Sequence, residues 1–214
     1  MLNGQRVLSA QKKKPGPTDS GNRGYDIITL KEKHPCPGNR SGAMLKFRLI
    51  RANGGIMIRA VVPEDRARLL SILVKTGVFT SREIDVAMEL IDIVLKNHQQ
   101  EDYEIECLVD GNGLPLGYIC HGPSPMTQGT FDLYWIAVDP GSQGTGVGSR
   151  LVDFLEKALR QKEGRMILAD TSTVPQYEKT RRFYLRQGFE EVARIRDYYS
   201  PGNDRVTFCK RISR

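Results

Sequence analysis

The sequence lacks long apolar runs and has few residues that could build a metal or disulfide framework. No stretch of its 214 residues approaches the roughly 20 apolar residues of a membrane-spanning helix, and its N-terminus has no short hydrophobic block typical of a secretory signal. We therefore expect no membrane contact and a cytoplasmic location. The sequence has no C-x-x-C pair, and its three His are not at metal-ligand spacings from its four Cys. It predicts no metal site and reduced, mostly buried thiols at Cys36, Cys107, Cys120 and Cys209.

The positive charge, +7 overall, lies before residue 51. That segment holds ten of the 32 Lys and Arg but only three of the 25 Asp and Glu, which leaves 22 of each in the remainder. The remainder is thus nearly neutral, and we expect no nucleic-acid binding from it. Contact of the basic segment with RNA, DNA or acidic surfaces is left open.

Two regions differ in composition. Residues 1–54 are basic and rich in Pro, Gly, Ser and Asn, a composition that buries too little apolar surface to offset ordering entropy. We expect a mostly disordered N-terminal extension there, a passive one rather than a contact arm, and a folded domain at 55–214. Met57, inside the first strand, is an alternative natural initiator.

Apolar periodicity and turn residues predict the order of elements in the domain. The pattern predicts a strand, two helices, three strands, a helix, a strand, a helix and two strands. In residue numbers these are 56–62, 63–77, 81–95, 103–109, 114–120, 131–138, 149–160, 165–169, 177–187, 190–196 and 205–210. Because the strands come in hairpin runs, we predict an α/β fold with a mixed, mostly antiparallel central sheet flanked by helices.

A strand, a glycine-rich turn and a helix at 130–160 form the most informative stretch. The apolar strand ends at Asp139-Pro140-Gly141, and the helix that follows has Leu151, Val152, Leu155 and Leu159 on one face. Glycines before a helix start leave backbone N–H groups free to bind phosphate. We predict phosphate contacts at Gln143, Gly144, Thr145, Gly146, Val147, Gly148 and Ser149. The turn has no Gly-Lys-Ser/Thr ending, and hairpin-linked strands precede it, so neither a P-loop nor a Rossmann fingerprint fits.

Together with Phe183-Tyr184-Leu185-Arg186-Gln187-Gly188-Phe189 downstream, this stretch resembles the GNAT superfamily of acetyl-CoA-dependent N-acetyltransferases. The resemblance spans roughly 55–211. Gln143, Gly146 and Gly148 match the Q/R-x-x-G-x-G form of the family's phosphate turn. The resemblance implies acetyl-CoA as cosubstrate, and it implies that the pantetheine arm bonds the exposed backbone of Ile136, Ala137 and Val138.

Acetyl transfer to an amine needs a proton for the departing thiolate, a base and a polarised carbonyl. The resemblance makes Tyr184 the acid, with aromatic packing beside Phe183 and Phe189 as its alternative role. The strand amide of Ile136 or Val138 is expected to polarise the carbonyl. Asp132, eleven positions before Gln143, matches the family's glutamate base, and alternation predicts that it shares a face with Tyr134, Ile136 and Val138. The alternative is a polar residue at a strand start. Weaker base candidates are Asp170, Glu104 and Glu106.

The sequence departs from the family pattern at Tyr177, where many members have an asparagine that bonds the CoA arm. Thr171, Ser172 or Thr173 are local substitutes for that contact. We interpret Arg181 and Arg182 as a solvated helix face rather than a phosphate site.

The predicted function is acetyl transfer to a small-metabolite or amino-acid-like primary amine, directly in a ternary complex. A protein N-terminal or lysine acetyltransferase is one alternative, and a non-catalytic acyl-CoA-binding regulatory module is the other. A homodimer is left open.

Overall fold

The computed structural model describes residues 50–51, 56–97 and 99–212. Apart from Ile50 and Arg51, the extension expected at 1–54 lies outside the described residues, as does Cys36. In this part of the chain the strands are β1 Ile50–Arg51, β2 Met57–Ala60, β3 Glu104–Val109, β4 Pro115–Pro123, β5 Thr130–Val138, β6 Met166–Ser172, β7 Glu190–Ser200 and β8 Asn203–Arg211. The α-helices are α2 Arg66–Thr76, α3 Ser81–Lys96, α4 Val147–Gln161 and α5 Glu178–Arg186, and short 3₁₀ turns cover Pro63–Asp65, Pro140–Ser142 and Pro175–Tyr177.

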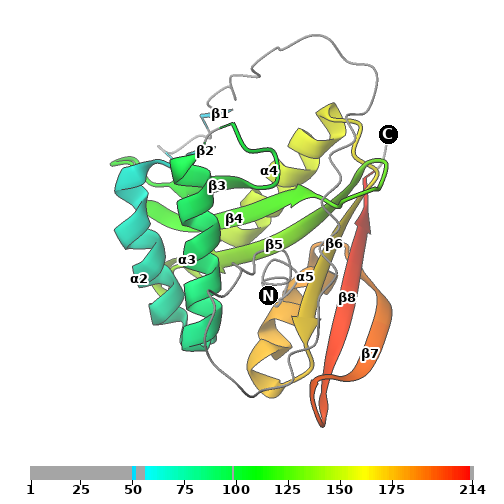
Figure 1. Cartoon of the computed structure of the whole chain (residues 1–214). Coiled ribbons are helices and arrows are strands. Elements are labelled where there is room, and N and C mark those ends of the chain that lie inside the picture. Colours follow the sequence, from blue (N-terminus) through cyan, green and yellow to red (C-terminus); the bar gives the residue numbers. More distant parts are fainter. Residues whose placement is uncertain (1–49, 52–55, 98, 213–214) are drawn as a thin grey trace, which may run out of the picture.

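One mixed sheet runs through the molecule (Figure 1) in the order β1-β2-β3-β4-β5-β6-β8-β7. Every pair of neighbours is antiparallel except β5 and β6. This confirms the predicted α/β class and the predicted order of elements. The last three strands are longer than predicted, and β1, which pairs with β2, was not predicted.

Local sequence explains how α2 and α3 are bounded. Gly77 ends α2 with a left-handed φ of +64°, a conformation that glycine adopts without steric cost. The predicted capping box at Thr80 and Glu83 is confirmed, since the Thr80 hydroxyl accepts from the Glu83 amide and the Glu83 carboxylate accepts from the Thr80 amide at 2.7 Å. The end of α2 and the start of α3 therefore lie where the local sequence predicts them.

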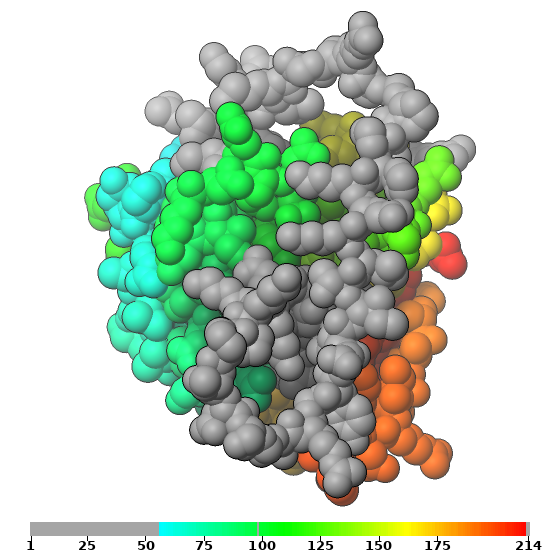
Figure 2. All heavy atoms as spheres, in the orientation of Figure 1, coloured from blue at the N-terminus to red at the C-terminus, as the bar shows by residue number. Residues whose placement is uncertain are grey.

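Two apolar clusters cover the two faces of the sheet. Helices α2 and α3 pack on one face with Cys107, Tyr118 and Trp135, and we call this the α2/α3 face. Helices α4 and α5 pack on the other, the α4/α5 face, with Ile136 and Phe208. In Figure 2, α2 and α3 lie at one side of the molecule and the β7–β8 hairpin at the other. No helix among the described residues combines the length and apolar character needed to cross a membrane.

The buried thiols make the free energy of unfolding depend on pH in the alkaline range. Cys107, Cys120 and Cys209 are free and buried, as predicted for those three. Burial raises the pKa of Cys107 and Cys120 above the ordinary thiol value of 9.0. The native chain thus keeps protons that the unfolded chain loses, so the stabilisation is complete below pH 9.0 and decreases as pH rises above it.

We expect the urea midpoint to fall above pH 9.0 and to fall less steeply in a Cys107→Ala/Cys120→Ala variant, compared with each protein's own midpoint near neutral pH. Equal pH dependence in the two proteins would contradict this contribution.

Candidate active site

Strands β5 and β6 separate within the sheet. Their parallel pairing covers Thr130–Met166, Phe131–Ile167 and Asp132–Leu168 and ends there. Beyond these residues β5 continues along β4, whereas β6 continues along β8. Figure 1 shows the two strands diverging, with α5 beside the opening. Among the described residues, no strand therefore pairs with the second half of β5 along this edge, which we call the open edge of β5.

The pairing with β4 determines which β5 backbone groups face that open edge. The Asp139 amide donates to the Leu116 carbonyl at 2.8 Å, and the same register pairs Ala137 with Tyr118. Since an antiparallel ladder alternates, Ala137 directs its N–H and C=O to β4, and Ile136 and Val138 direct theirs away from it. The Gln143 side-chain amide donates to the Val138 carbonyl at 3.3 Å, as this direction requires. The expectation for Ala137 is therefore wrong, because its backbone groups point into the ladder.

A β-bulge interrupts the alternation of side chains along β5. Cys120 pairs with Trp135 but His121 pairs with Leu133, so Tyr134 is the extra residue of the bulge. Tyr134 and Trp135 both lie in the core of the α2/α3 face, whereas Leu133 and Ile136 lie in the core of the α4/α5 face.

Asp132 alternates with Phe131 and Leu133, so it faces the α2/α3 side with Tyr134. The predicted common face with Ile136 and Val138 is wrong because the bulge shifts the alternation by one residue. Asp132 is 2% exposed, and its Oδ2 accepts from the Ser124 hydroxyl at 2.5 Å.

The glycine-rich turn leads directly into α4. Gly144 and Gly146 have φ of +80° and +87°, and Gly146 occupies the N-cap position with no side-chain cap. Residues 143–146 are exposed. No side chain in the described part of the chain caps the first amides of α4, which lie at the positive end of the helix dipole, an arrangement that binds anions.

Helix α5 is fastened to the first turn of α4. A Cβ on Gly148 would lie 3.1 Å from the Phe183 ring, and the Gln187 side chain donates to the Ser149 hydroxyl at 2.9 Å. Glycine at 148 thus permits a close approach of the two helices, and the Ser149 hydroxyl is already engaged by α5.

Tyr184 lies in the core of the α4/α5 face. Its ring is 5.3 Å from the Phe189 ring and 5.6 Å from the Phe208 ring, and the residue is 1% exposed. Burial raises the pKa of Tyr184 well above its ordinary value, and the nearby carboxylate of Asp170 raises it further. The hydroxyl consequently stays protonated at neutral pH, the state that an acid requires.

Tyr177 makes a contact that the sequence did not predict. It is 2% exposed, and its hydroxyl donates to Glu83 Oε1 at 2.7 Å, which joins the start of α5 to the start of α3. Ser172 is hydrogen-bonded to Asn203, and Thr173 Oγ1 accepts from the Asp204 amide. Thr171 Oγ1 is buried without a hydrogen-bond partner in the described part of the chain.

Arg181 and Arg182 of α5 have partners within the protein. Arg181 donates to the Ser172 carbonyl at 2.6 Å and to the Val174 carbonyl at 3.1 Å. Arg182 pairs with Glu178. Arg181 is therefore not the solvated residue that we predicted, because it holds the loop after β6.

The weaker base candidates fall on different faces. Glu104 and Glu106 alternate with Ile105 and Cys107 of the α2/α3 core, so they face α4, away from Asp132. Glu104 pairs with Lys162, and Glu106 Oε2 lies 3.1 Å from His121 Nε2. These three potential ligands, Glu104, Glu106 and His121, lie close enough together to hold a metal ion, a grouping that sequence spacing did not reveal. Asp170 lies on the α2/α3 side and pairs with Arg205 at 2.8 Å.

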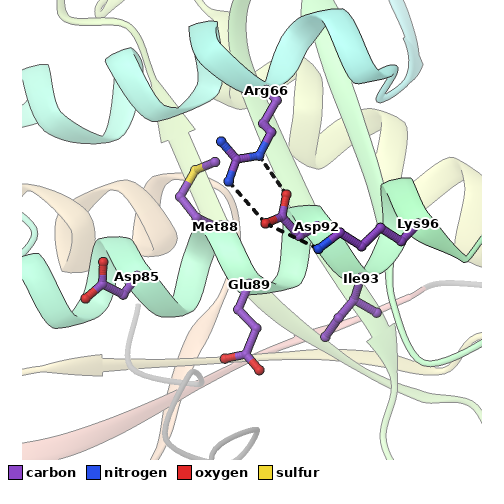
Figure 3. Close-up of a pocket in the computed structure, with 7 residues that line it drawn as sticks. All are labelled: Arg66, Asp85, Met88, Glu89, Asp92, Ile93 and Lys96. Carbon is purple, nitrogen blue, oxygen red and sulfur yellow. Dashed lines mark hydrogen bonds and ion pairs between the residues drawn. The ribbon is translucent and has the colours of Figure 1, made fainter.

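A groove of about 380 Å³ lies elsewhere, between α2 and α3 (Figure 3). Arg66 from α2 forms an ion pair with Asp92 of α3 at 2.7 Å, and Lys96 lies 4.0 Å from the same carboxylate. The groove shares no residue with the open edge of β5, the glycine-rich turn or Tyr184.

A family model described as an acetyltransferase (GNAT) domain matches residues 103–191. A putative acetyltransferase of the GNAT family from Desulfovibrio desulfuricans has a similar structure, with 36% sequence identity and a TM-score of 0.71 over 74% of this chain and 99% of that chain. The chain therefore belongs to the GNAT family of acetyltransferases.

More distant structures share the fold. An aminoglycoside 6'-N-acetyltransferase complexed with coenzyme A has 17% identity and a TM-score of 0.58, over 73% of this chain and 97% of that chain. The ribosomal-protein-S18-alanine N-acetyltransferase from Escherichia coli has 21% identity and a TM-score of 0.58, over 74% of this chain and 95% of that chain. No curated protein matches the chain. Because these two neighbours act on different acceptors, fold likeness leaves the acceptor open.

Proposed function

We propose that the protein is an N-acetyltransferase that moves an acetyl group from acetyl-CoA to a primary amine of a small metabolite or amino-acid-like acceptor, directly in a ternary complex. We assign this reaction to a domain at 55–214. The observation that carries the proposal is the open edge of β5 beside the uncapped N-terminus of α4.

The donor fits this part of the chain. The pyrophosphate of acetyl-CoA would be held by backbone amides of residues 143–149, at the positive end of α4. Its pantetheine arm would bond Ile136 and Val138 as an additional strand would, with Val138 exchanging its contact to Gln143 for the ligand. When bound, acetyl-CoA supplies an activated acyl group and a thiolate leaving group.

The chain's own residues would then move protons and stabilise charge. The amide of Ile136 or Val138 donates to the carbonyl oxygen, where negative charge develops. Tyr184 gives its proton to the departing sulfur as the carbon–sulfur bond breaks, and its raised pKa keeps that proton in place at neutral pH until then. Asp132 takes the proton of the attacking amine through a water molecule, since an aspartate is shorter than the glutamate it replaces.

The turn gives a test of donor binding. A Gly146→Ala change forces a Cβ into a left-handed conformation with φ +87°, which costs about 1–2 kcal/mol and displaces the first amides of α4. We expect the affinity for acetyl-CoA, measured by isothermal titration calorimetry, to fall about 5- to 30-fold.

Gly113→Ala is the matched control for this test. Gly113 has φ +82° and, like Gly146, open space where a Cβ would be, but it lies in the β3–β4 turn. The control should lose stability without losing acetyl-CoA affinity. Equal loss of affinity in the two variants would remove the turn from the donor site.

Two other functions make different predictions. A protein N-terminal or lysine acetyltransferase would modify peptides in preference to free amines in a competition assay. A non-catalytic acyl-CoA-binding regulatory module would bind acetyl-CoA but release no CoA with any amine. Screening amines and peptides side by side for CoA release separates the three.

A further inference from the structure

A charged cluster lies on the α2/α3 face of β6 and β8, beyond the two helices. Asp170 is 5% exposed and is held by Thr207, which donates at 2.6 Å, and by Arg205 at 2.8 Å. Ile167 and Ala169 lie in the core of the opposite face, so Leu168 and Asp170 face this side. Leu168 pairs with Asp132 on β5, which places the cluster and Asp132 on one face of the sheet.

Arg205 is fixed but incompletely hydrogen-bonded. Its side chain is 14% exposed, with Asp170 on one side and the Tyr198 ring on another, 5.1 Å from the guanidinium carbon. Its Nε is buried and has no hydrogen-bond partner within the described ranges. A buried donor without a partner is costly, and Nε–H can only donate, so its partner must be an oxygen or another acceptor.

Tyr199 presents a second group of the same kind. Its hydroxyl is buried and, among the described residues, makes no hydrogen bond. Burial raises the pKa of Tyr199, the carboxylates of Asp170 and Glu83 raise it further, and the Arg205 guanidinium lowers it. The Tyr199 ring meets the Tyr198 ring edge to face, with centroids 4.8 Å apart, and the Arg205 guanidinium lies over that same Tyr198 ring.

The chemistry of these groups selects the ligand. A guanidinium edge and a phenol hydroxyl match the two oxygens of a carboxylate. A phosphate dianion would be repelled by the negative charge of the adjacent Asp170. A carboxylate carries one negative charge instead of two, so the repulsion from Asp170 would be half as large. A purely cationic acceptor would leave Nε without an acceptor. A zwitterion suits the face as a whole, because its ammonium group is attracted by Asp132.

We propose that Arg205 and Tyr199 bind a carboxylate of the acceptor, so that the acceptor carries a carboxylate besides its amine. The assignment of the amine to the reaction rests on the proposed function, whereas the binding of the carboxylate does not. Arg205 and Tyr199 act here as specificity residues, and Asp170 positions Arg205.

The test is a binding titration of the CoA-loaded protein, with acetylation measured separately. The probes are free α-amino acids of both enantiomers, their carboxamides, and dipeptides, which separate a free amino acid from a peptide C-terminus as the source of the carboxylate. The variants are Arg205→Lys and Tyr199→Phe, each checked by thermal melting. Arg160→Lys, at an exposed ion pair with Glu156 on α4, is the matched control.

We expect at least one carboxylate probe to bind more tightly than its carboxamide, and both variants to weaken carboxylate binding about tenfold while leaving carboxamide binding unchanged. Arg160→Lys should behave as the wild type. Such binding without acetylation would support the carboxylate site and refute the proposed function. Acetylation of carboxamides and carboxylates at equal rates, or absence of carboxylate binding, would overturn the carboxylate site and leave the reaction in place.

Discussion

Replacing Tyr184 with Phe is expected to lower kcat for acetyl transfer by about 10²-fold or more, the usual contribution of a positioned acid. Affinity for acetyl-CoA should persist, because the ring packing against Phe189 and Phe208 is kept and only the hydroxyl is removed. Calorimetry for binding and CoA release for turnover distinguish the two effects.

Tyr118→Phe is the matched control for this substitution. The Tyr118 hydroxyl is also buried, and in the described part of the chain it makes no hydrogen bond. That variant should keep full activity. In the wild type, loss of the Tyr184 proton should not lower kcat below pH 10.0. That pH is the ordinary pKa of a tyrosine, and the pKa of Tyr184 is raised above it. An active Tyr184→Phe enzyme would return Tyr184 to a packing role.

Asp132→Asn is expected to have the second large effect. The change removes the base but keeps the shape of the side chain and an oxygen for the Ser124 hydroxyl. We expect kcat to fall about 10²-fold, and the limb of the pH–rate profile that reports the base to disappear.

Ser124→Ala, which removes the hydrogen bond and leaves the carboxylate, should reduce activity far less. A full-activity Asp132→Asn variant would move the base elsewhere, and Asp170 would be tested next because it lies on the same side of the sheet.

Local patterns in the sequence predicted the order of helices and strands because each element has its own periodicity and its own caps. The capping box of Thr80 with Glu83 and the helix-ending Gly77 are signals that span only a few residues. The structure contains both as predicted. The Tyr134 bulge could not be read this way. Its existence depends on the register between β4 and β5, and a single extra residue moved Ile136 and Val138 to the face opposite Asp132.

The side-chain contacts around the site join segments that are distant in sequence. Tyr177 bonds Glu83, 94 positions away, and Asp170 bonds Arg205 across the β6–β8 pairing. Spacing along the chain carries no information on such pairs. Resemblance to a family therefore indicated the residues proposed to bind the donor, whereas Arg205 and Tyr199, proposed to bind the acceptor, emerged only from the fold.

The most direct test of the proposed reaction uses acetyl-CoA labelled in its acetyl group, incubated with the wild-type protein and a panel of primary amines. Mass spectrometry should find the label on an amine nitrogen of the acceptor, with an equal amount of CoA released, and no label on the protein when the acceptor is omitted. Binding of acetyl-CoA without labelled product for any amine or peptide would contradict acetyl transfer. Label on the protein in the absence of acceptor would contradict direct transfer in a ternary complex.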